Sequence, residues 1–124
     1  MVVRAGNDGA AALPSPASDP QLLVVGAQDE NDTAVRSDDE VADFSAYGKA
    51  FGFVRPDVVA PGVSLISTSP VDSTAYQQNP ASQVGTGFLK GSGTSMSAAV
   101  AAGAVAALVA QRPALTPDDA KRLL

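Results

Sequence analysis

The stretch Gly91-Ser92-Gly93-Thr94-Ser95-Met96-Ser97 runs directly into an alanine- and valine-rich segment, residues 98–110. Small, flexible residues lead into strong helix formers, with hydroxyl residues at the junction. Because residues 98–110 place almost no polar group on any face, they predict a helix buried in a protein core. About 15 apolar residues fall short of the roughly 20 needed to cross a bilayer, which favours a core helix over a membrane span.

Ser95 falls in the first turn of this predicted helix. The backbone N–H groups there lack intrahelical partners, and the peptide dipoles add partial positive charge. An oxyanion beside Ser95 would therefore be stabilised. The local pattern leaves an alternative, in which Thr94 or Ser95 only caps the helix, since Ser and Thr are preferred at that position.

Residues 93–103 (Gly-Thr-Ser-Met-Ser-Ala-Ala-Val-Ala-Ala-Gly) resemble the nucleophile motif of the subtilases, the subtilisin-like serine proteases. By that resemblance Ser95 is the nucleophile. One departure lies in the motif, because Ala99 and Val100 stand where the family usually has Pro-His. Neither position has a catalytic role, so the departure concerns packing and suggests an outlying branch of the family.

A second block, residues 2–9, resembles the subtilase strand that ends in Ala-Gly-Asn-(Glu/Asp)-Gly. Its local pattern alone favours a turn residue at Asn7, since Gly, Asn and Asp close tight turns. The resemblance implies instead that the Asn7 side chain donates to the oxyanion hole. It also implies that Gly6, Asp8 and Thr94 belong to the substrate-binding region, with Asp8 at the edge of the primary specificity pocket.

Further blocks match the family more weakly and indicate a series of strands. Strands are expected over residues 1–5, 22–25, 41–47 with Phe44 facing inward, 57–60 and 63–68. Residues 10–20 contain three prolines and predict a loop, with Ser15-Pro16 as the candidate cis peptide bond. Residues 69–84 are polar and are predicted to form an exposed segment outside the core. Thr116 and Pro117 indicate the start of a second helix.

Composition excludes several classes of protein. The net charge of −5 with no cluster of Lys or Arg argues against nucleic-acid partners and anionic membranes. The absence of cysteine rules out disulfides and thiolate metal sites.

Residues 29–40 hold six of the 13 acidic residues, but the glycine of an EF-hand loop is missing, which favours a solvated loop. By the resemblance Asp57 falls where some relatives place a cation ligand. No cofactor is expected, and a structural calcium or monovalent cation stays open.

The sequence contains no histidine. Subtilases use Asp, His and Ser in that chain order, so the resemblance implies that residues 1–124 are the C-terminal portion of a peptidase domain whose Asp and His precede Met1. The implied fold is a doubly wound, mostly parallel α/β sheet around a buried nucleophile helix.

The implied function is that of a serine endopeptidase acting on polypeptides, outside the cell or at its envelope. This chain would contribute the nucleophile and oxyanion hole, would be inactive alone, and would have the missing N-terminal part as its partner. Two alternatives remain: a catalytically dead subtilase-like binding or scaffold module, and an unrelated α/β protein in which Ser95 lies in a helix cap.

Overall fold

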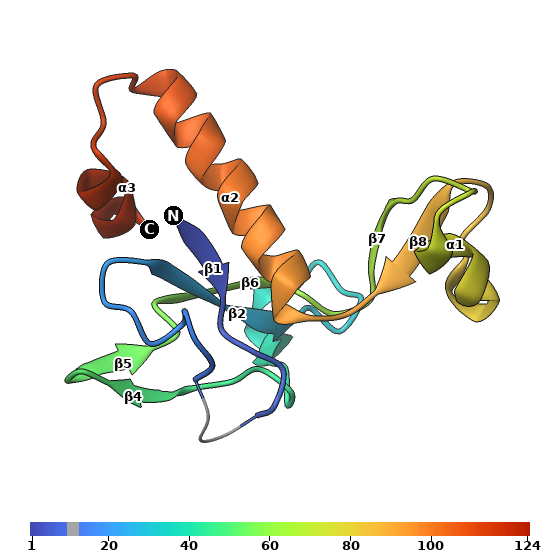
Figure 1. The fold of residues 1–124 in the computed structure, drawn as a ribbon, viewed down its shortest axis with the longest axis horizontal. Coiled ribbons are helices and arrows are strands. Elements are labelled where there is room, and N and C mark those ends of the chain that lie inside the picture. Colours follow the sequence, from blue (N-terminus) through green and yellow to red (C-terminus); the bar gives the residue numbers. More distant parts are fainter. Residues whose placement is uncertain (10–12) are drawn as a thin grey trace.

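A computed structural model describes residues 1–9 and 13–124, and shows a mixed α/β fold (Figure 1). The main sheet contains β1 (Val2–Arg4), β2 (Leu23–Asp29), β3 (Glu40–Val41) and β6 (Val58–Pro61). β2 pairs in parallel with β1 and β6 and antiparallel with β3. β1 and β3 follow one another along the same edge of β2, because the N–H groups of Ala5 and Ala42 donate to the carbonyls of Val25 and Ala27 at 2.9 and 3.0 Å.

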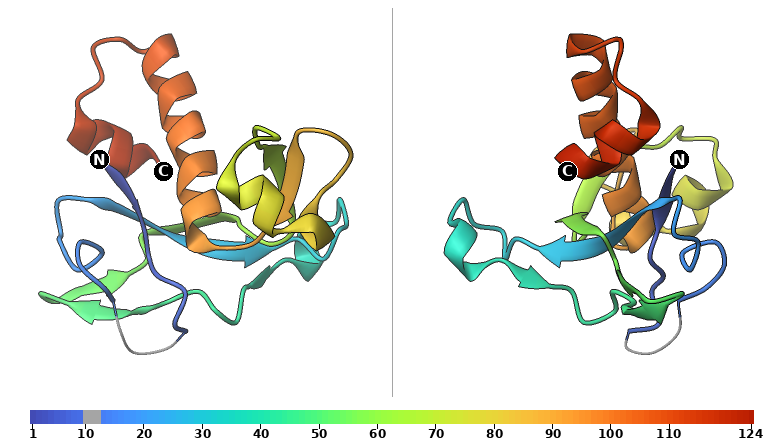
Figure 2. Two further views of the ribbon diagram at one scale, coloured as in Figure 1. Left: turned by 45° about the vertical axis from the view of Figure 1, so that its right-hand side comes forward. Right: turned by 90° about the vertical axis from the view of Figure 1, so that its left-hand side faces the viewer.

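The apolar run at the start of β2 is explained by burial of both faces of the strand. Leu23 and Val25 point to one face, where they pack with Ala60 and Ala101. Val24 points to the other face, where it packs with Ala5 and Ala17. In the left view of Figure 2 the long helix α2 (Thr94–Gln111) lies on one side of the sheet, and the loop after β1 lies on the other.

Two hairpins extend from this body. β4 (Gly48–Ala50) pairs with β5 (Phe53–Arg55), and β7 (Leu65–Thr68) pairs with β8 (Phe88–Gly91). Residues 62–92, here called the arm, also carry α1 (Thr74–Gln78) and the short 3-10 helix η2 (Pro80–Ser82), and project from the body in Figure 1. The part of the arm that contains α1 and η2 is held by its own hydrogen bonds, including one from the Tyr76 hydroxyl to the Gly85 carbonyl at 3.0 Å.

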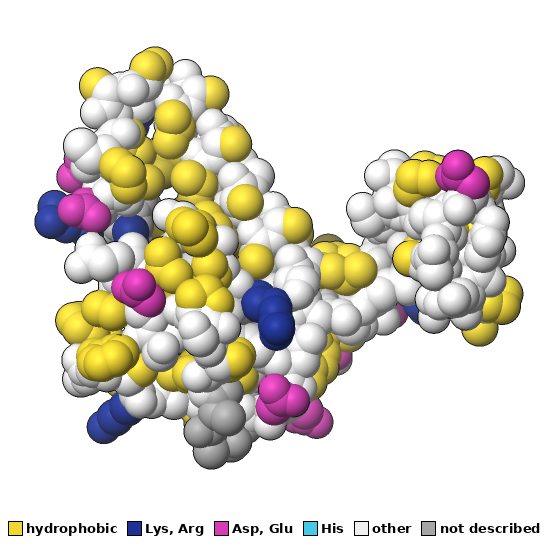
Figure 3. Space-filling model, viewed as in Figure 1, with side chains coloured by type: hydrophobic (Ala, Val, Ile, Leu, Met, Phe, Trp, Pro, Cys, Tyr) yellow, Lys and Arg dark blue, Asp and Glu magenta, His cyan; other side chains and the backbone are white. Residues whose placement is uncertain are grey.

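The long helix α2 packs on the sheet through a single stripe. Thr94, Ser97 and Ala101 are its only buried residues, and Val105, one turn further on, is partly buried against the same core. The expectation of a helix buried on all sides is therefore wrong for this structure, because the sheet covers one face and most residues on the other faces are exposed. Figure 3 shows apolar side chains along the uncovered helix.

By length and composition α2 would also suffice to cross a membrane, a test that core helices of soluble proteins pass too. It is followed by α3 (Pro117–Leu123), which begins where expected. The Thr116 side chain accepts from the Asp119 N–H, and the Asp119 carboxylate accepts from the Thr116 N–H, which makes a capping box.

The expected strands over residues 1–5, 22–25, 57–60 and 63–68 are confirmed in position, whereas the strand over 41–47 is wrong. The strand β3 ends at Val41, because the Ser45 N–H turns back to the Ala42 carbonyl at 2.8 Å and closes a turn that leaves Phe44 half-buried.

The cis bond at Ser15-Pro16 is confirmed, and Arg55-Pro56 is also cis. The loop expected over residues 10–20 is confirmed from residue 13 onward, and residues 10–12 lie outside the described part. The acidic residues 29–40 form a mostly exposed loop that contains the 3-10 helix η1 (Arg36–Asp38).

Candidate active site

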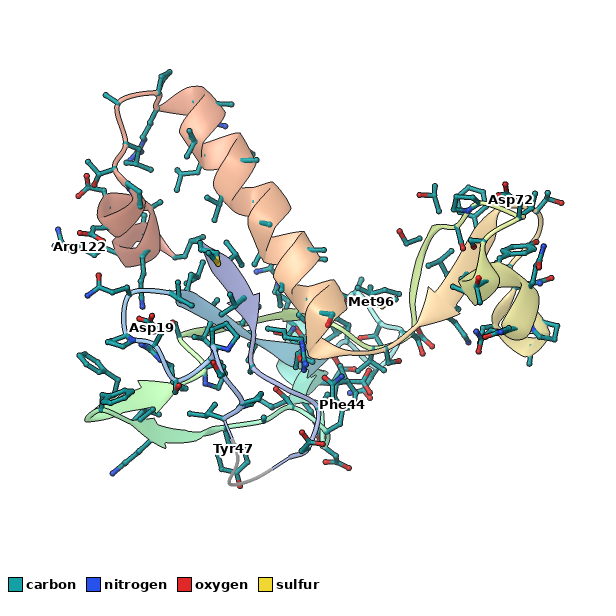
Figure 4. The ribbon with its side chains drawn as sticks, in the orientation of Figure 1. Asp19, Phe44, Tyr47, Asp72, Met96 and Arg122 are labelled. Atoms are coloured by element: carbon teal, nitrogen blue, oxygen red, sulfur yellow. The ribbon has the colours of Figure 1, made fainter. Side chains whose placement is uncertain are left out.

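Ser95 is exposed in the first turn of α2, immediately after the arm returns to the body. Gly93 adopts φ +153° at the junction, a conformation that glycine tolerates best, and its N–H donates to the Gly62 carbonyl at 2.8 Å. Strand β8 and the base of the arm thus hold the helix start in place. Met96 lies beside Ser95 at the base of α2 (Figure 4).

Asn7 reaches the same helix start from the end of β1. Its carboxamide oxygen accepts from the Thr94 N–H at 3.0 Å and from the Thr94 hydroxyl at 2.7 Å. The Thr94 hydroxyl in turn accepts from the Gly6 N–H at 3.2 Å. Two segments 87 residues apart are therefore joined by one fully buried threonine.

Because the oxygen of Asn7 is bonded to Thr94, the amide nitrogen points to the other side, toward Gly93 and Ser95. A Cβ atom built on Gly93 would lie 3.4 Å from Asn7 Nδ2 and 4.0 Å from the Ser95 backbone nitrogen. Within residues 1–9 and 13–124, neither nitrogen donates a hydrogen bond. Asn7 Nδ2 and the Ser95 backbone nitrogen therefore both lie near Gly93, at the start of α2, without an acceptor among the described residues.

A largely apolar pocket of about 390 Å³ opens at Ser95 on the side facing the arm. Its lining comes from strand β7 and from the first turns of α2: Leu65, Ile66, Ser67, Ser95, Met96, Ala99 and Val100. Ala99 and Val100, the two departures from the family motif, therefore shape the surface next to the candidate nucleophile.

Gly62 lets α2 approach the sheet closely, a role that sequence reasoning missed. A Cβ atom on Gly62 would lie 2.1 Å from Ser97 Oγ and 2.7 Å from Ala27 Cβ. Ser97 is fully buried, and its hydroxyl has no hydrogen-bond partner among the described residues. The Gly-Thr-Ser-Met-Ser motif signalled the helix start but not this contact.

The remaining predicted residues divide by exposure. Asp8 is exposed and follows Asn7 in the chain, whereas Gly6 is buried and Thr94 is 0% exposed. Thr94 is thus placed to hold Asn7, with its side chain turned away from solvent. Asp57 lies at the far end of the sheet, where it pairs with Arg55 and Lys121.

Two kinds of functional group are missing from the described residues: a histidine base and a metal-binding cluster. The sequence has no histidine, so none stands beside Ser95. No cluster of three or more His, Cys, Asp or Glu residues that could hold a metal occurs in residues 1–9 and 13–124.

Comparison with known proteins identifies serine proteases as relatives of this chain. The chain is 41% identical over 127 residues to the serine protease AprX of Bacillus subtilis, and 34% identical over 124 residues to the cell wall-associated protease of the same organism. Both alignments cover 100% of this chain, but only 29% and 11% of the relatives.

A crystal structure of a cold adapted subtilisin-like serine proteinase superposes with a TM-score of 0.70 at 29% identity. A psychrophilic protease, S41, superposes with a TM-score of 0.73 at 28% identity. These alignments cover 99% and 98% of this chain and 36% and 37% of those structures, so the chain spans about a third of their length. The model of the subtilase family matches residues 1–124, and the chain belongs to the subtilase family.

Proposed function

We propose that this chain carries the nucleophile and the oxyanion hole of a serine endopeptidase whose general base lies outside residues 1–124. The observation that carries the proposal is that Asn7 Nδ2 and the Ser95 N–H both lie near Gly93 without an acceptor among the described residues, at the position of the exposed Ser95. A helix cap or a scaffold has no use for two such donors beside a hydroxyl residue.

The reaction is acyl transfer through Ser95. The Ser95 oxygen bonds to the carbonyl carbon of a peptide while the base removes the hydroxyl proton. Asn7 Nδ2 and the Ser95 N–H stabilise the negative oxygen of the tetrahedral intermediate. Collapse of the intermediate breaks the C–N bond and releases the amine, which takes the proton, and water then hydrolyses the acyl-enzyme.

The base and its orienting carboxylate come from a separate segment that docks on α2 and the pocket beside Ser95. Two features support this assignment: the sequence has no histidine, and the apolar faces of α2 are uncovered. The docked segment completes a doubly wound, mostly parallel sheet and makes α2 a core helix. The chain alone is expected to be inactive.

The substrate is a polypeptide, and the compartment is extracellular or the cell envelope, as the name of the cell wall-associated relative suggests. The exposed Asp8 at the rim of the site favours polar or basic side chains next to the cleaved bond. No cofactor takes part in the chemistry.

A chimaera in which this chain replaces the matching residues of AprX tests the proposal. The chimaera should hydrolyse peptides, and its Ser95→Ala variant should lose at least about 10³-fold in kcat/KM. A chimaera that folds cooperatively but shows no Ser95-dependent hydrolysis would support the binding or scaffold alternative instead. The parent AprX serves as the control for the assay.

A further inference from the structure

Three oxygen atoms surround the ammonium group of Lys121 at the start of the sheet. Lys121 Nζ donates to the carbonyls of Pro20 at 3.0 Å and Leu22 at 2.5 Å, and lies 3.4 Å from Asp57 Oδ2. The two carbonyl oxygens come from the turn before β2 and the carboxylate oxygen from the residue before β6. Lys121 comes from α3, about a hundred residues after the turn. The ammonium group of Lys121 therefore links α3 to the turn at residues 19–22.

Asp57 is fixed in place by other contacts. Its Oδ2 accepts from the Val24 N–H at 2.8 Å, and its Oδ1 pairs with Arg55. Arg55 is 2% exposed, and its second terminal nitrogen reaches the Asp19 carbonyl at 3.4 Å. Asp57, the charged member of the oxygen cluster, is thus held by the sheet and by a buried guanidinium as well as by Lys121.

Carbonyl and carboxylate oxygens on a rigid turn are the donor set that hard cations take in proteins. An ammonium group has three N–H donors and no acceptor, and here it faces three oxygens. We propose that the Pro20 and Leu22 carbonyls and Asp57 form a monovalent-cation site whose cation is the chain's own Lys121 ammonium. The site does not fit a separate structural ion as long as Lys121 occupies it.

The proposal has a consequence for the terminal helix. Ala120 is the one buried residue of α3. Lys121 is the next residue, so its bonds to Pro20 and Leu22 tie α3 to the edge of the sheet. Removing the side chain should loosen α3 and the turn, and should leave an oxygen cluster that a potassium or ammonium ion from solution can fill.

Hydrogen–deuterium exchange followed by mass spectrometry reports on both segments. We would measure the 124-residue chain fused to a soluble carrier, in tetramethylammonium, potassium or ammonium chloride at one ionic strength. In tetramethylammonium, Lys121→Ala should exchange about tenfold faster than wild type over residues 18–25 and 113–124. Potassium or ammonium should restore protection in Lys121→Ala, and wild type should respond equally to all three salts.

Two variants serve as controls. Arg122→Ala removes the same charge one residue away, from a side chain that is 77% exposed and points outward (Figure 4), so its exchange should stay near that of wild type. Lys121→Met fills the space with an apolar side chain, so potassium should not restore the protection of this variant from exchange.

The proposal is overturned if wild type itself needs potassium for protection, since a separate ion would then occupy the cluster. It is also overturned if Lys121→Ala exchanges no faster than Arg122→Ala. A third contradictory result would be that none of the three cations, or all three equally, restore the protection of Lys121→Ala.

Discussion

Asn7 and Thr94, 87 residues apart, are joined by two hydrogen bonds to a single oxygen: the Thr94 N–H and the Thr94 hydroxyl both donate to Asn7 Oδ1. This pairing turns the Asn7 amide nitrogen toward Ser95 and Gly93. Because Thr94 is fully buried, we expect it to act on the proposed reaction only by positioning Asn7.

Replacing Thr94 by Val should therefore affect both catalysis and stability. The buried Gly6 N–H would lose its acceptor, at a cost of about 1–3 kcal/mol in the free energy of unfolding. In the AprX chimaera kcat should fall with little change in KM, and by less than for Asn7→Ala. Losing such a donor costs subtilisin itself about 10²–10³-fold in kcat.

Thr94→Ser keeps the hydroxyl and should restore most of kcat. If Thr94→Val raised KM and left kcat unchanged, Thr94 would be acting on substrate binding and not on Asn7.

The close approach of α2 to the sheet at Gly62 predicts opposite effects of two glycine substitutions. Gly62→Ala forces a Cβ atom into Ser97 Oγ and Ala27, and should cost about 1–3 kcal/mol of stability. Gly103→Ala meets no atom within 4 Å in the middle of α2 and should add about 0.5–1 kcal/mol. Chemical denaturation of the isolated chain measures both, because in the chimaera the docked segment would lie against α2.

A second substitution isolates the cause of the Gly62→Ala effect. Adding Ser97→Ala removes the nearer clashing atom and a buried hydroxyl without a partner in the described structure, so the double variant should recover part of the loss. If the changes in unfolding free energy of the two single variants simply add in the double variant, the Gly62–Ser97 contact is not the source of the Gly62→Ala loss.

The uncovered face of α2 predicts that the chain alone associates with itself. Val100 and Val109 are 42% and 38% exposed. Replacing both by Glu should shift the isolated chain toward monomer in sedimentation velocity, because an exposed apolar patch is removed.

In the chimaera the same double substitution should cost about 3 kcal/mol or more, because a docked segment would bury the two charges. Val54→Glu is the matched control, at an exposed site on the β4–β5 hairpin. Equal effects of the two changes in the chimaera would mean that nothing docks on α2.

The capping box of α3 predicts a pH dependence. Hydrogen bonds from the Thr116 side chain and backbone hold the pKa of Asp119 below its ordinary value of 3.8, with a smaller contribution from Arg122. A lowered pKa means that the charged form stabilises the folded state. The stabilisation is complete above about pH 4 and is lost as the pH falls through the lower, folded-state pKa.

Asp119→Asn should therefore reduce the loss of thermal stability of the chimaera between about pH 5 and pH 2. Asp118→Asn, in the same helical turn but without a capping hydrogen bond, should leave that loss unchanged. The assignment fails if the two variants show the same pH profile.

The positions of Ser95 at a helix start and of Asn7 after a strand could be predicted from local sequence, whereas the roles proposed for them come from the resemblance to the subtilases. Ser95 lies in one contiguous motif, and Asn7 follows a strand whose apolar residues and turn are adjacent in sequence. Strand β2 could be predicted too, because a strand that is buried on both faces is apolar at successive positions and does not alternate with polar residues.

What could not be predicted depends on distant partners. The 41–47 stretch has strand-like residues, but a bond from Ser45 to Ala42 closes a turn instead. The exposure of α2 depends on what lies against it and not on its composition. Lys121 and Pro20 are separated by 101 residues, and no local pattern links them.

Peptide hydrolysis by the isolated chain, by the AprX chimaera and by its Ser95→Ala variant is the decisive measurement for the proposed function. We expect activity in the chimaera alone, because only there do Ser95 and Asn7 meet a base and an orienting carboxylate. Ser95-dependent hydrolysis by the isolated chain, or hydrolysis by the chimaera that survives Ser95→Ala, would contradict the proposed function.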